Sequence, residues 1–242
     1  LQMDGSHHAW NGQEKWCLIG AIDDASSEIP ACRFFDSEDT FSALAVIEEI
    51  IKKHGIPCSV YVDRGKAFGG IRDEEENQFR RACEELGITV INALSPQAKG
   101  RVERMWRTFQ DRLIPEMRLN KIHTMKAANE YLESQFIPKY WNVRNSVSPR
   151  EEESRYRKTD QNLDLGSILC KKYRRRMRSN QTFDFRGTTY RLKSPVPGSI
   201  AGEDITIREY PDGSWRVYFR GLEAKFTPWS LGRRVRTLKK AS

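Results

Sequence analysis

The order of apolar segments in the first half of the sequence constrains the fold more than any other feature. A continuous apolar run at 16–22 stops at Asp23-Asp24, which is typical of a buried strand. A second short strand is expected at 29–35. Apolar residues then recur with helical spacing over 41–51, and this pattern predicts a helix that packs on the strands.

Further segments continue the alternation of strand and helix. Together with a strand at the N-terminus, the sequence predicts strands at 58–62 and 88–91 and helices at 74–86 and from Pro96 onward. Strands joined first by hairpins and then by helical crossovers form a mixed sheet with helices on its faces. Three strands, helix, strand, helix, strand and helix is the order of an RNase H-like α/β core with a five-stranded sheet.

The C-terminal part of the sequence has a different residue pattern. More helix is expected over 121–156, with an interruption at Pro138. Residues 182–192 alternate around an Arg-Gly turn, and Pro-Asp-Gly at 211–213 separates two more alternating segments. Several short strands within about 70 residues predict a small β-barrel.

These patterns suggest a division of the chain. We expect the RNase H-like core at 1–150, a charged and polar linker at 151–165, and the small C-terminal β-barrel at 166–235. The barrel is expected to bind DNA, because it is strongly basic.

The formal net charge of +8 is unevenly distributed along the 242 residues. Residues 1–95 hold 9 Lys and Arg against 17 Asp and Glu, a net charge of −8. Residues 96–150 hold 11 against 5, a net of +6, and residues 151–242 hold 21 against 11, a net of +10. An acidic region followed by two basic ones suggests carboxylates gathered for a metal and cations gathered for phosphates.

Composition argues against several classes of protein. No apolar run approaches the roughly 18 residues of a membrane span, so we expect no membrane partner. The five cysteines are scattered and lack C-x-x-C spacing, which predicts neither a disulfide framework nor a zinc site and favours the cytoplasm. Leu1 opens a stretch that already reads as a strand, so we expect a fragment whose N-terminal part is missing.

Three carboxylates fall where this fold would bring them together. Asp4 lies in the first strand, Asp63 follows the strand at 58–62, and Glu103 lies on the long helix. The first strand of such a core is central and the fourth pairs beside it, so the helix can present Glu103 to both aspartates. Carboxylate oxygens suit Mg²⁺ or Mn²⁺, and two such ions can activate the attacking oxygen of a phosphodiester reaction and stabilise the leaving one.

Other polar residues compete for these roles. Asp23 and Asp24 are alternatives for the first ligand, although a hairpin turn or cap explains them as well. His8 is a candidate for substrate contact, with a structural role as the alternative. The acidic run at 73–76 is expected to be a solvated loop.

Four segments resemble the successive sequence blocks of DDE transposases with a retroviral integrase-type catalytic core. They are L-Q-M-D-G-S-H-H-A-W, A-I-D-D-A-S, Y-V-D-R-G-K-A-F and S-P-Q-A-K-G-R-V-E-R-M-W. The resemblance covers roughly residues 1–150 and is strongest to ISNCY-type bacterial insertion-sequence transposases. The later barrel resembles, more loosely, the barrel of Mu-type transposases. The resemblance implies that Asp4, Asp63 and Glu103 bind metal and catalyse, and that a helix-turn-helix region precedes the chain.

Cations surround these carboxylates and recur at the start of the barrel. Solvated surface charge is the alternative in each case, but we expect contacts to DNA phosphates because clustered cations repel one another without an anion. The cations are Lys99, Arg101, Arg104, Arg107, Lys171, Lys172, Arg174, Arg175, Arg176 and Arg178. Gln97, in the same stretch as Lys99, is expected to reach a base or sugar edge of the DNA.

The sequence thus predicts a transposase that uses two Mg²⁺ or Mn²⁺ ions to cleave DNA 3′ ends and transfer them to a target duplex. Its expected partners are double-stranded DNA and further copies of itself on paired transposon ends, in the nucleoid of a bacterial cytoplasm. Two alternatives are left open. One is an RNase H-like nuclease or resolvase without strand transfer, and the other is a non-catalytic DNA-binding protein descended from a transposase.

Overall fold

The structure is a computed structural model that describes residues 1–63, 68, 78–93, 100–149 and 154–229. It divides into two compact units, Leu1–Cys170 and Lys171–Ser242. The described part of the expected linker, from Ser154 on, therefore belongs to the first unit. No helix in the described ranges is long and apolar enough to cross a membrane.

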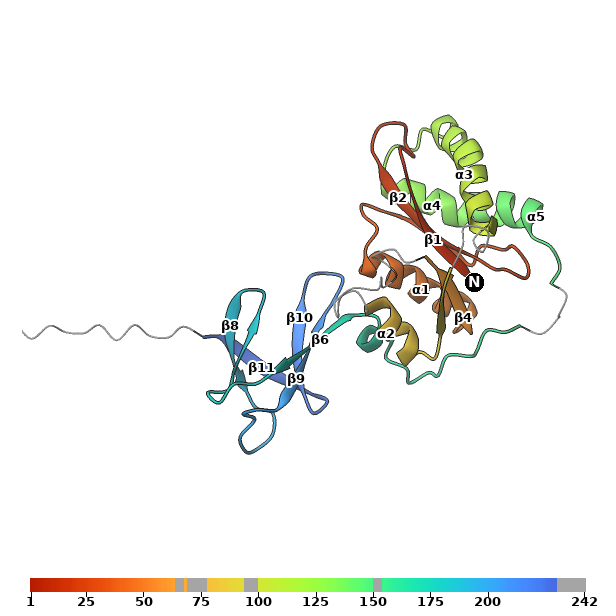
Figure 1. Cartoon of the computed structure of the whole chain (residues 1–242). Coiled ribbons are helices and arrows are strands. Elements are labelled where there is room, and N and C mark those ends of the chain that lie inside the picture. The colour runs from red at the N-terminus through yellow and green to blue at the C-terminus, as the bar shows by residue number, and fades with distance from the viewer. Residues whose placement is uncertain (64–67, 69–77, 94–99, 150–153, 230–242) are drawn as a thin grey trace, which may run out of the picture. The chain divides into compact units, whose positions relative to one another are not determined.

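The first unit is built on a five-stranded mixed sheet (Figure 1). Its strands are β1 (Gln2–His8), β2 (Trp16–Ile22), β3 (Ala31–Phe35), β4 (Ser59–Val62) and β5 (Thr89–Asn92). They lie in the order β3-β2-β1-β4-β5, with β1, β2 and β3 antiparallel and β4 and β5 parallel to β1. This order confirms the RNase H-like fold, with β1 at the centre of the sheet.

Helices cover both faces of this sheet. They are α1 (Thr40–His54), α2 (Gln78–Glu85), α3 (Gly100–Leu119), α4 (Met125–Tyr131), the π-helix η4 (Leu132–Trp141), α5 (Asn142–Asn145) and α6 (Leu165–Ile168). Alternate residues of the strands enter two separate apolar cores. Cys17, Ile19 and Ala21 of β2 pack with α1 and α2, whereas Leu18 and Ile22 pack with α3 and η4. The period-2 pattern of the strands thus distributes the helices between the two faces.

The helical region after α3 differs from the expectation. Helix was expected over 121–156, but it ends at Asn145 and residues 146–149 are extended or irregular. Pro138 was expected to interrupt the helix and does not. It lies inside η4, where the wider i→i+5 pattern accommodates a residue that lacks a backbone N–H.

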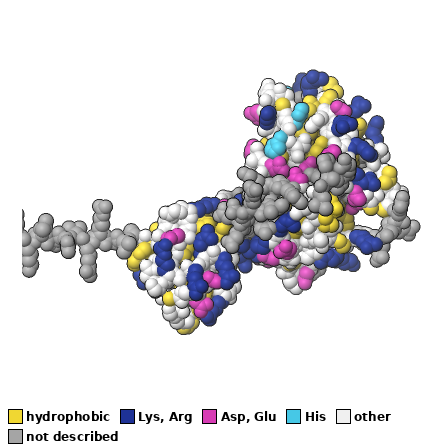
Figure 2. Space-filling model, in the orientation of Figure 1, with side chains coloured by type: hydrophobic (Ala, Val, Ile, Leu, Met, Phe, Trp, Pro, Cys, Tyr) yellow, Lys and Arg dark blue, Asp and Glu magenta, His cyan; other side chains and the backbone are white. Residues whose placement is uncertain are grey.

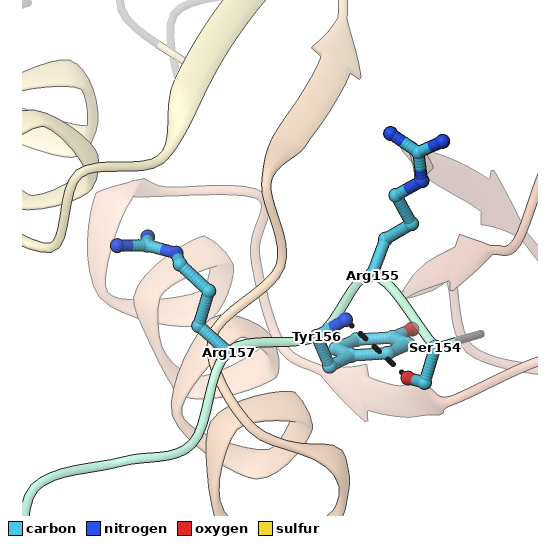
Figure 3. A pocket seen from close by; sticks show the side chains of 4 residues that line it. All are labelled: Ser154, Arg155, Tyr156 and Arg157. Atoms are coloured by element: carbon cyan, nitrogen blue, oxygen red, sulfur yellow. Dashed lines mark hydrogen bonds between the residues drawn. The ribbon is translucent and has the colours of Figure 1, made fainter.

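The segment 154–157 packs against the rest of the first unit, and its side chains line a pocket at the surface (Figure 3). Arg157 exchanges backbone hydrogen bonds with Ile56, each 2.9 Å long, and its guanidinium donates to the carbonyl oxygens of Leu86 and Gly87. Tyr156 packs against the core on the α1 side. These contacts hold the segment against the rest of the first unit.

The second unit is a small barrel of six antiparallel strands. They are β6 (Lys171–Arg176), β7 (Thr182–Phe185), β8 (Thr188–Lys193), β9 (Asp204–Glu209), β10 (Trp215–Phe219) and β11 (Leu222–Pro228), in the order β6-β9-β10-β11-β8-β7. Arg178 N–H donates to Thr182 O and draws the two end strands together. Inward residues such as Phe183, Ile207 and Val217 form one core. The expected hairpins and barrel are confirmed.

Candidate functional site

Asp4 lies at the centre of the sheet, on the face that α3 crosses. It is half-buried on β1, and the indole N–H of Trp106 donates to its Oδ2 at 3.1 Å. Gln2, two residues earlier on the same face, accepts a hydrogen bond from the backbone N–H of Val102 at 3.3 Å. Two successive turns of α3 are therefore fixed to β1 through polar contacts that flank Asp4.

A close approach of backbone and ring makes the contact with Trp106 possible. Gly20 of β2 is the direct partner of Asp4 in the antiparallel register. A Cβ atom at Gly20 would lie 3.2 Å from the Trp106 ring and 2.7 Å from Cys32 Sγ. The absence of a side chain at this position therefore lets the indole lie flat enough over β2 to reach Asp4.

Asp63 follows β4 directly and is half-buried. The parallel register pairs Gln2 of β1 with Tyr61 of β4. Extended by two positions, this register would align Asp63 with Asp4, and neighbouring strands lie about 4.8 Å apart. The strand order thus makes neighbours of the two strands that lead to these aspartates, which are far apart in the sequence.

Glu103 is exposed in the first turn of α3. It follows Val102, which is bonded to Gln2, and precedes by three positions Trp106, which is bonded to Asp4. Residues three apart are neighbours on a helix surface, so Glu103 belongs to the turn of α3 that crosses β1. The apolar residues Val102, Met105 and Phe109 hold this turn against the sheet.

The donor set fits a hard divalent cation, because it consists of carboxylate oxygens. Among the residues that the structure describes, Asp4, Asp63 and Glu103 are not all within 4.8 Å of one another. Two metal ions lie about 3.5–4 Å apart, so the ligands that hold a pair of ions can be farther from one another than the ligands of a single ion. Their shared role as metal ligands remains a prediction.

The competing acids have other contacts. Asp23 accepts hydrogen bonds from the backbone N–H groups of Ala25 and Ser26, as a turn aspartate does. Asp24 pairs with Arg101 at 2.9 Å and accepts from the Gln2 amide. His8 lies with its ring edge-on to Trp10, 5.5 Å between centroids.

The cations of α3 divide into two groups. Arg101 is engaged, because it also donates to Ser27 Oγ at 2.8 Å. Arg104 and Arg107 are exposed, and in the described part of the chain no ion pair is seen for either. Gln97 and Lys99 lie outside the described residues. Figure 2 shows Lys and Arg side chains near α3 and on the visible face of the barrel.

The predicted phosphate contacts on β6 and just after it divide in the same way. Arg174 pairs with Asp204, and Arg178 pairs with Asp184. Arg175 lies over the ring of Tyr173, and Arg176 is exposed. Lys171 and Lys172 begin the strand and are half-buried.

A row of cations crosses three strands of the barrel. Lys172 on β6 pairs in register with Arg208 on β9, which pairs with Arg216 on β10. The guanidinium of Arg208 lies 4.0 Å from the centre of the Tyr218 ring, and its buried Nε has no hydrogen-bond partner among the described residues. Arg216 pairs with Glu223 at 3.5 Å. Like charges directly opposite each other are destabilising, so even with Glu223 beside it this row, Lys172, Arg208 and Arg216, suits an anion.

Sequence reasoning missed Arg208 and Arg216. The signal was present, because the two segments that flank Pro-Asp-Gly at 211–213 alternate, and a hairpin there pairs them strand against strand. Reading the register across that hairpin would have aligned the two arginines. The alignment with Lys172 depends on the pairing of β6 with β9, which is separated from it by a long stretch of sequence.

Comparisons with known proteins point to one group of relatives. No family model matches the chain. It is 32% identical over 244 aligned positions to the transposase-like protein y4bF of Sinorhizobium fredii, covering 97% of this chain and 53% of the relative. It is 43% identical over 140 positions to the transposase of insertion sequence IS1202 of Streptococcus pneumoniae, covering 54% of this chain and 30% of that protein. The chain thus spans about half or less of these relatives.

The solved structures that align with the chain include two from retroviruses. The magnesium complex of the HTLV-2 integrase catalytic core domain aligns with a TM-score of 0.44 at 20% identity, over 53% of this chain and 78% of that one. A simian T-cell lymphotropic virus intasome aligns with a TM-score of 0.48 at 18% identity, over 94% of this chain and 75% of that one.

Proposed function

We propose that this chain, a relative of bacterial insertion-sequence transposases, carries the catalytic core of a DDE transposase. It would hydrolyse a phosphodiester at each transposon end and then join the resulting 3′-OH to a target duplex. The observation that supports the proposal is the parallel pairing of β1 with β4 at Gln2 and Tyr61, two positions before Asp4 and Asp63. Glu103 lies on the turn of α3 whose Val102 and Trp106 contact β1.

Asp4, Asp63 and Glu103 would hold the metal. Bound Mg²⁺ or Mn²⁺, in the two-ion scheme, would polarise the phosphodiester and lower the pKa of the attacking hydroxyl. The protein's own part is orientation. The Trp106 N–H donates to Oδ2 of Asp4 and would hold that carboxylate in a fixed orientation toward the metal.

Cations on both units would hold the DNA. Arg104 and Arg107 lie one and four positions after Glu103 on α3 and could contact phosphates next to the cleaved bond. On the barrel, the row Lys172, Arg208 and Arg216 would contact a further stretch of the phosphate backbone. Such contacts carry no base information, so recognition of the end sequence would depend on other parts of the protein.

The partners follow from the reaction. Two ends must be joined in concert, so the protein would act as a homo-oligomer on double-stranded DNA, in the cytoplasm of a bacterium. In this scheme water is the first nucleophile and the DNA 3′-OH is the second, and each step breaks one phosphate–oxygen bond as it forms another.

The test is a pair of assays on this chain that need no end recognition. The first measures nicking of supercoiled plasmid in Mg²⁺ or Mn²⁺, and the second measures joining of a labelled 3′-OH oligonucleotide to the plasmid. We expect Asp63→Asn to abolish both reactions, because an amide is a poor ligand for these ions. The matched control is Asp24→Asn, which removes an aspartate of the ion pair with Arg101 and should leave most activity.

The outcomes separate the alternatives. Nicking without joining would indicate a nuclease or resolvase. DNA binding without any metal-dependent nicking would indicate a non-catalytic protein. Wild-type rates for the Asp63→Asn variant would reject the proposed centre altogether.

A further inference from the structure

Three side chains that can ligate a metal gather on the opposite face of β1 from Asp4. They are His7 on β1, Cys17 on β2 and Glu38 between β3 and α1, and one ligand atom from each lies within 4.8 Å of the others. His7 and Cys17 are direct partners in the antiparallel register. His7 Nε2 and Glu38 Oε2 are 2.9 Å apart.

Backbone geometry holds Glu38 in this group. Gly5 lies two residues before His7 and on the same face of β1. A Cβ atom at Gly5 would lie 2.7 Å from the carboxyl carbon of Glu38 and 2.8 Å from its Oε1. The carboxylate therefore occupies the place of a side chain on the central strand, where only glycine leaves room for it.

The group is layered from the interior to the surface. Cys17 is fully buried and belongs to the core on the α1 side. The Glu38 side chain is 21% exposed and that of His7 is 55% exposed. The thiol thus lies at the bottom, and the two ligands that reach solvent lie above it.

We propose that His7, Cys17 and Glu38 form a binding site for a borderline-soft divalent cation such as Zn²⁺, with water as the fourth ligand. Thiolate, imidazole and carboxylate are the ligands that Zn²⁺ accepts in tetrahedral sites, and three protein ligands plus water is a common set. Mg²⁺ prefers an all-oxygen environment and would not compete. The site joins three segments, so bound metal would fix the strand that carries Asp4 to the start of α1.

Spacing along the sequence gives no hint of this site, because the ligands come from three separate segments. Its chemistry also differs from that of the proposed catalytic centre, so the proposal does not depend on the transposase function. The thiolate is the form of cysteine that ligates metal, so the thiol proton of Cys17 would leave to solvent as the metal binds.

The experiment titrates the metal-stripped chain with Co²⁺ in the presence of excess Mg²⁺, under reducing conditions. We expect a thiolate-to-cobalt charge-transfer band in the near ultraviolet. The band should saturate at about one equivalent of Co²⁺ per chain and disappear on addition of Zn²⁺. Zn²⁺ should also raise the thermal unfolding midpoint of the chain, because a ligand of the native state stabilises it.

Variants of the exposed ligands keep the test independent of folding. His7→Gln and Glu38→Gln alter partly exposed side chains, and each should weaken Co²⁺ binding by at least about tenfold, since even the loss of an outer-shell partner costs that much. Cys17→Ser should remove the charge-transfer band. Cys58→Ser is the matched control, because Cys58 is exposed and lies outside the group.

Three results would overturn the proposal. One is the absence of a thiolate band with wild-type protein. Another is a band that Cys58→Ser removes and Cys17→Ser does not. The third is unchanged affinity in both His7→Gln and Glu38→Gln.

Discussion

At the scale of single residues, the indole of Trp106 is what links the helix that carries Glu103 to the strand that carries Asp4. Its ring packs in the core beneath α3, and its N–H donates to Asp4. A hydrogen bond to a carboxylate is charge-assisted and stronger than a neutral one. Trp106 is therefore a positioning residue that sets the orientation of a metal ligand.

Trp106→Phe keeps an aromatic ring and removes the donor. We expect nicking to fall by about tenfold or more, because a hydrogen bond to a charged group contributes about 1.5–3 kcal/mol. The Mn²⁺ concentration for half-maximal nicking should rise as well, which a purely structural role would not produce. Trp16→Phe is the control, since Trp16 is equally buried and donates to Glu14. Equal rates in the two variants would contradict the assignment.

Sequence reasoning located the three candidate acids but not their surroundings. Asp4 and Asp63 could be placed because strand pattern and fold order fix which strands are neighbours. The ion pair of Arg101 with Asp24 and its hydrogen bond to Ser27 could not be foreseen, because these contacts join α3 to the turn after β2. Contacts of that kind depend on tertiary packing, which leaves no period in the sequence.

At the scale of elements, the outer edge of the first sheet is closed by a side chain. β3 is the end strand, and Asn129 of α4 accepts from Phe34 N–H at 2.7 Å and donates to Phe34 O at 3.2 Å. The carboxamide thus takes the place of a neighbouring strand and blocks edge-to-edge pairing at this point.

Asn129→Ala should lower the free energy of unfolding by about 1–3 kcal/mol, because it leaves a buried backbone N–H and C=O without partners. Chemical denaturation followed by circular dichroism measures this change. Asn120→Ala removes an exposed asparagine at the end of α3 and should change stability by less than about 0.5 kcal/mol. Similar losses in the two variants would show that the edge contact contributes little.

Gly55, at the end of α1, is a point of close approach to the segment 154–157. Its φ is +101°, and a Cβ atom there would lie 2.5 Å from Arg157 O. Gly55→Ala should cost about 2–4 kcal/mol, since backbone strain and a clash add together. It should also speed hydrogen exchange at the amides of Ile56 and Arg157.

Gly12→Ala separates the two causes. Gly12 also has a positive φ, +81°, but nothing lies within 4 Å of its Cβ position. Its substitution should cost only about 1–2 kcal/mol, the strain alone. If Gly55→Ala were no more destabilising than Gly12→Ala and left exchange unchanged, the docking of 154–157 would be too weak to matter.

Elements of strong periodicity were predictable, and their ends were not. The strand order of the core and the barrel hairpins follow from alternation and turn residues. The helix expected to 156 ends at Asn145, and just beyond it the backbone N–H of Val147 donates to Ser26 O at 2.8 Å, a contact outside any helix. The π-helix around Pro138 likewise depends on packing, since its apolar face serves the same core as α3.

At the scale of the whole molecule, the acidic and the basic parts of the sequence are proposed to have different roles, metal binding and DNA binding. The acidic region 1–95 holds two of the three candidate metal ligands, Asp4 and Asp63, and the basic barrel offers the row Lys172, Arg208 and Arg216. Each phosphate that such a cation neutralises releases counterions, so the salt dependence of DNA binding counts these contacts.

Arg208→Gln and Arg216→Gln should each weaken binding of the chain to duplex DNA, whatever its sequence. The slope of log affinity against log salt concentration should fall by about 0.9 for each lost phosphate contact. Fluorescence anisotropy over a salt series measures this slope. Arg220→Gln is the control, because Arg220 pairs with Glu203 at 3.0 Å, outside the row. An unchanged slope in both row variants would remove the row from the DNA-binding surface.

The central claim is that Asp4, Asp63 and Glu103 hold the working metal, and anomalous diffraction from crystals of the chain soaked in Mn²⁺ tests it most directly. The account predicts Mn²⁺ bound by carboxylate oxygens of all three residues, with Trp106 still donating to Asp4, and loss of that metal in Asp63→Asn. Mn²⁺ bound instead at Asp23 and Asp24, or bound at the triad equally well in Asp63→Asn, would contradict it.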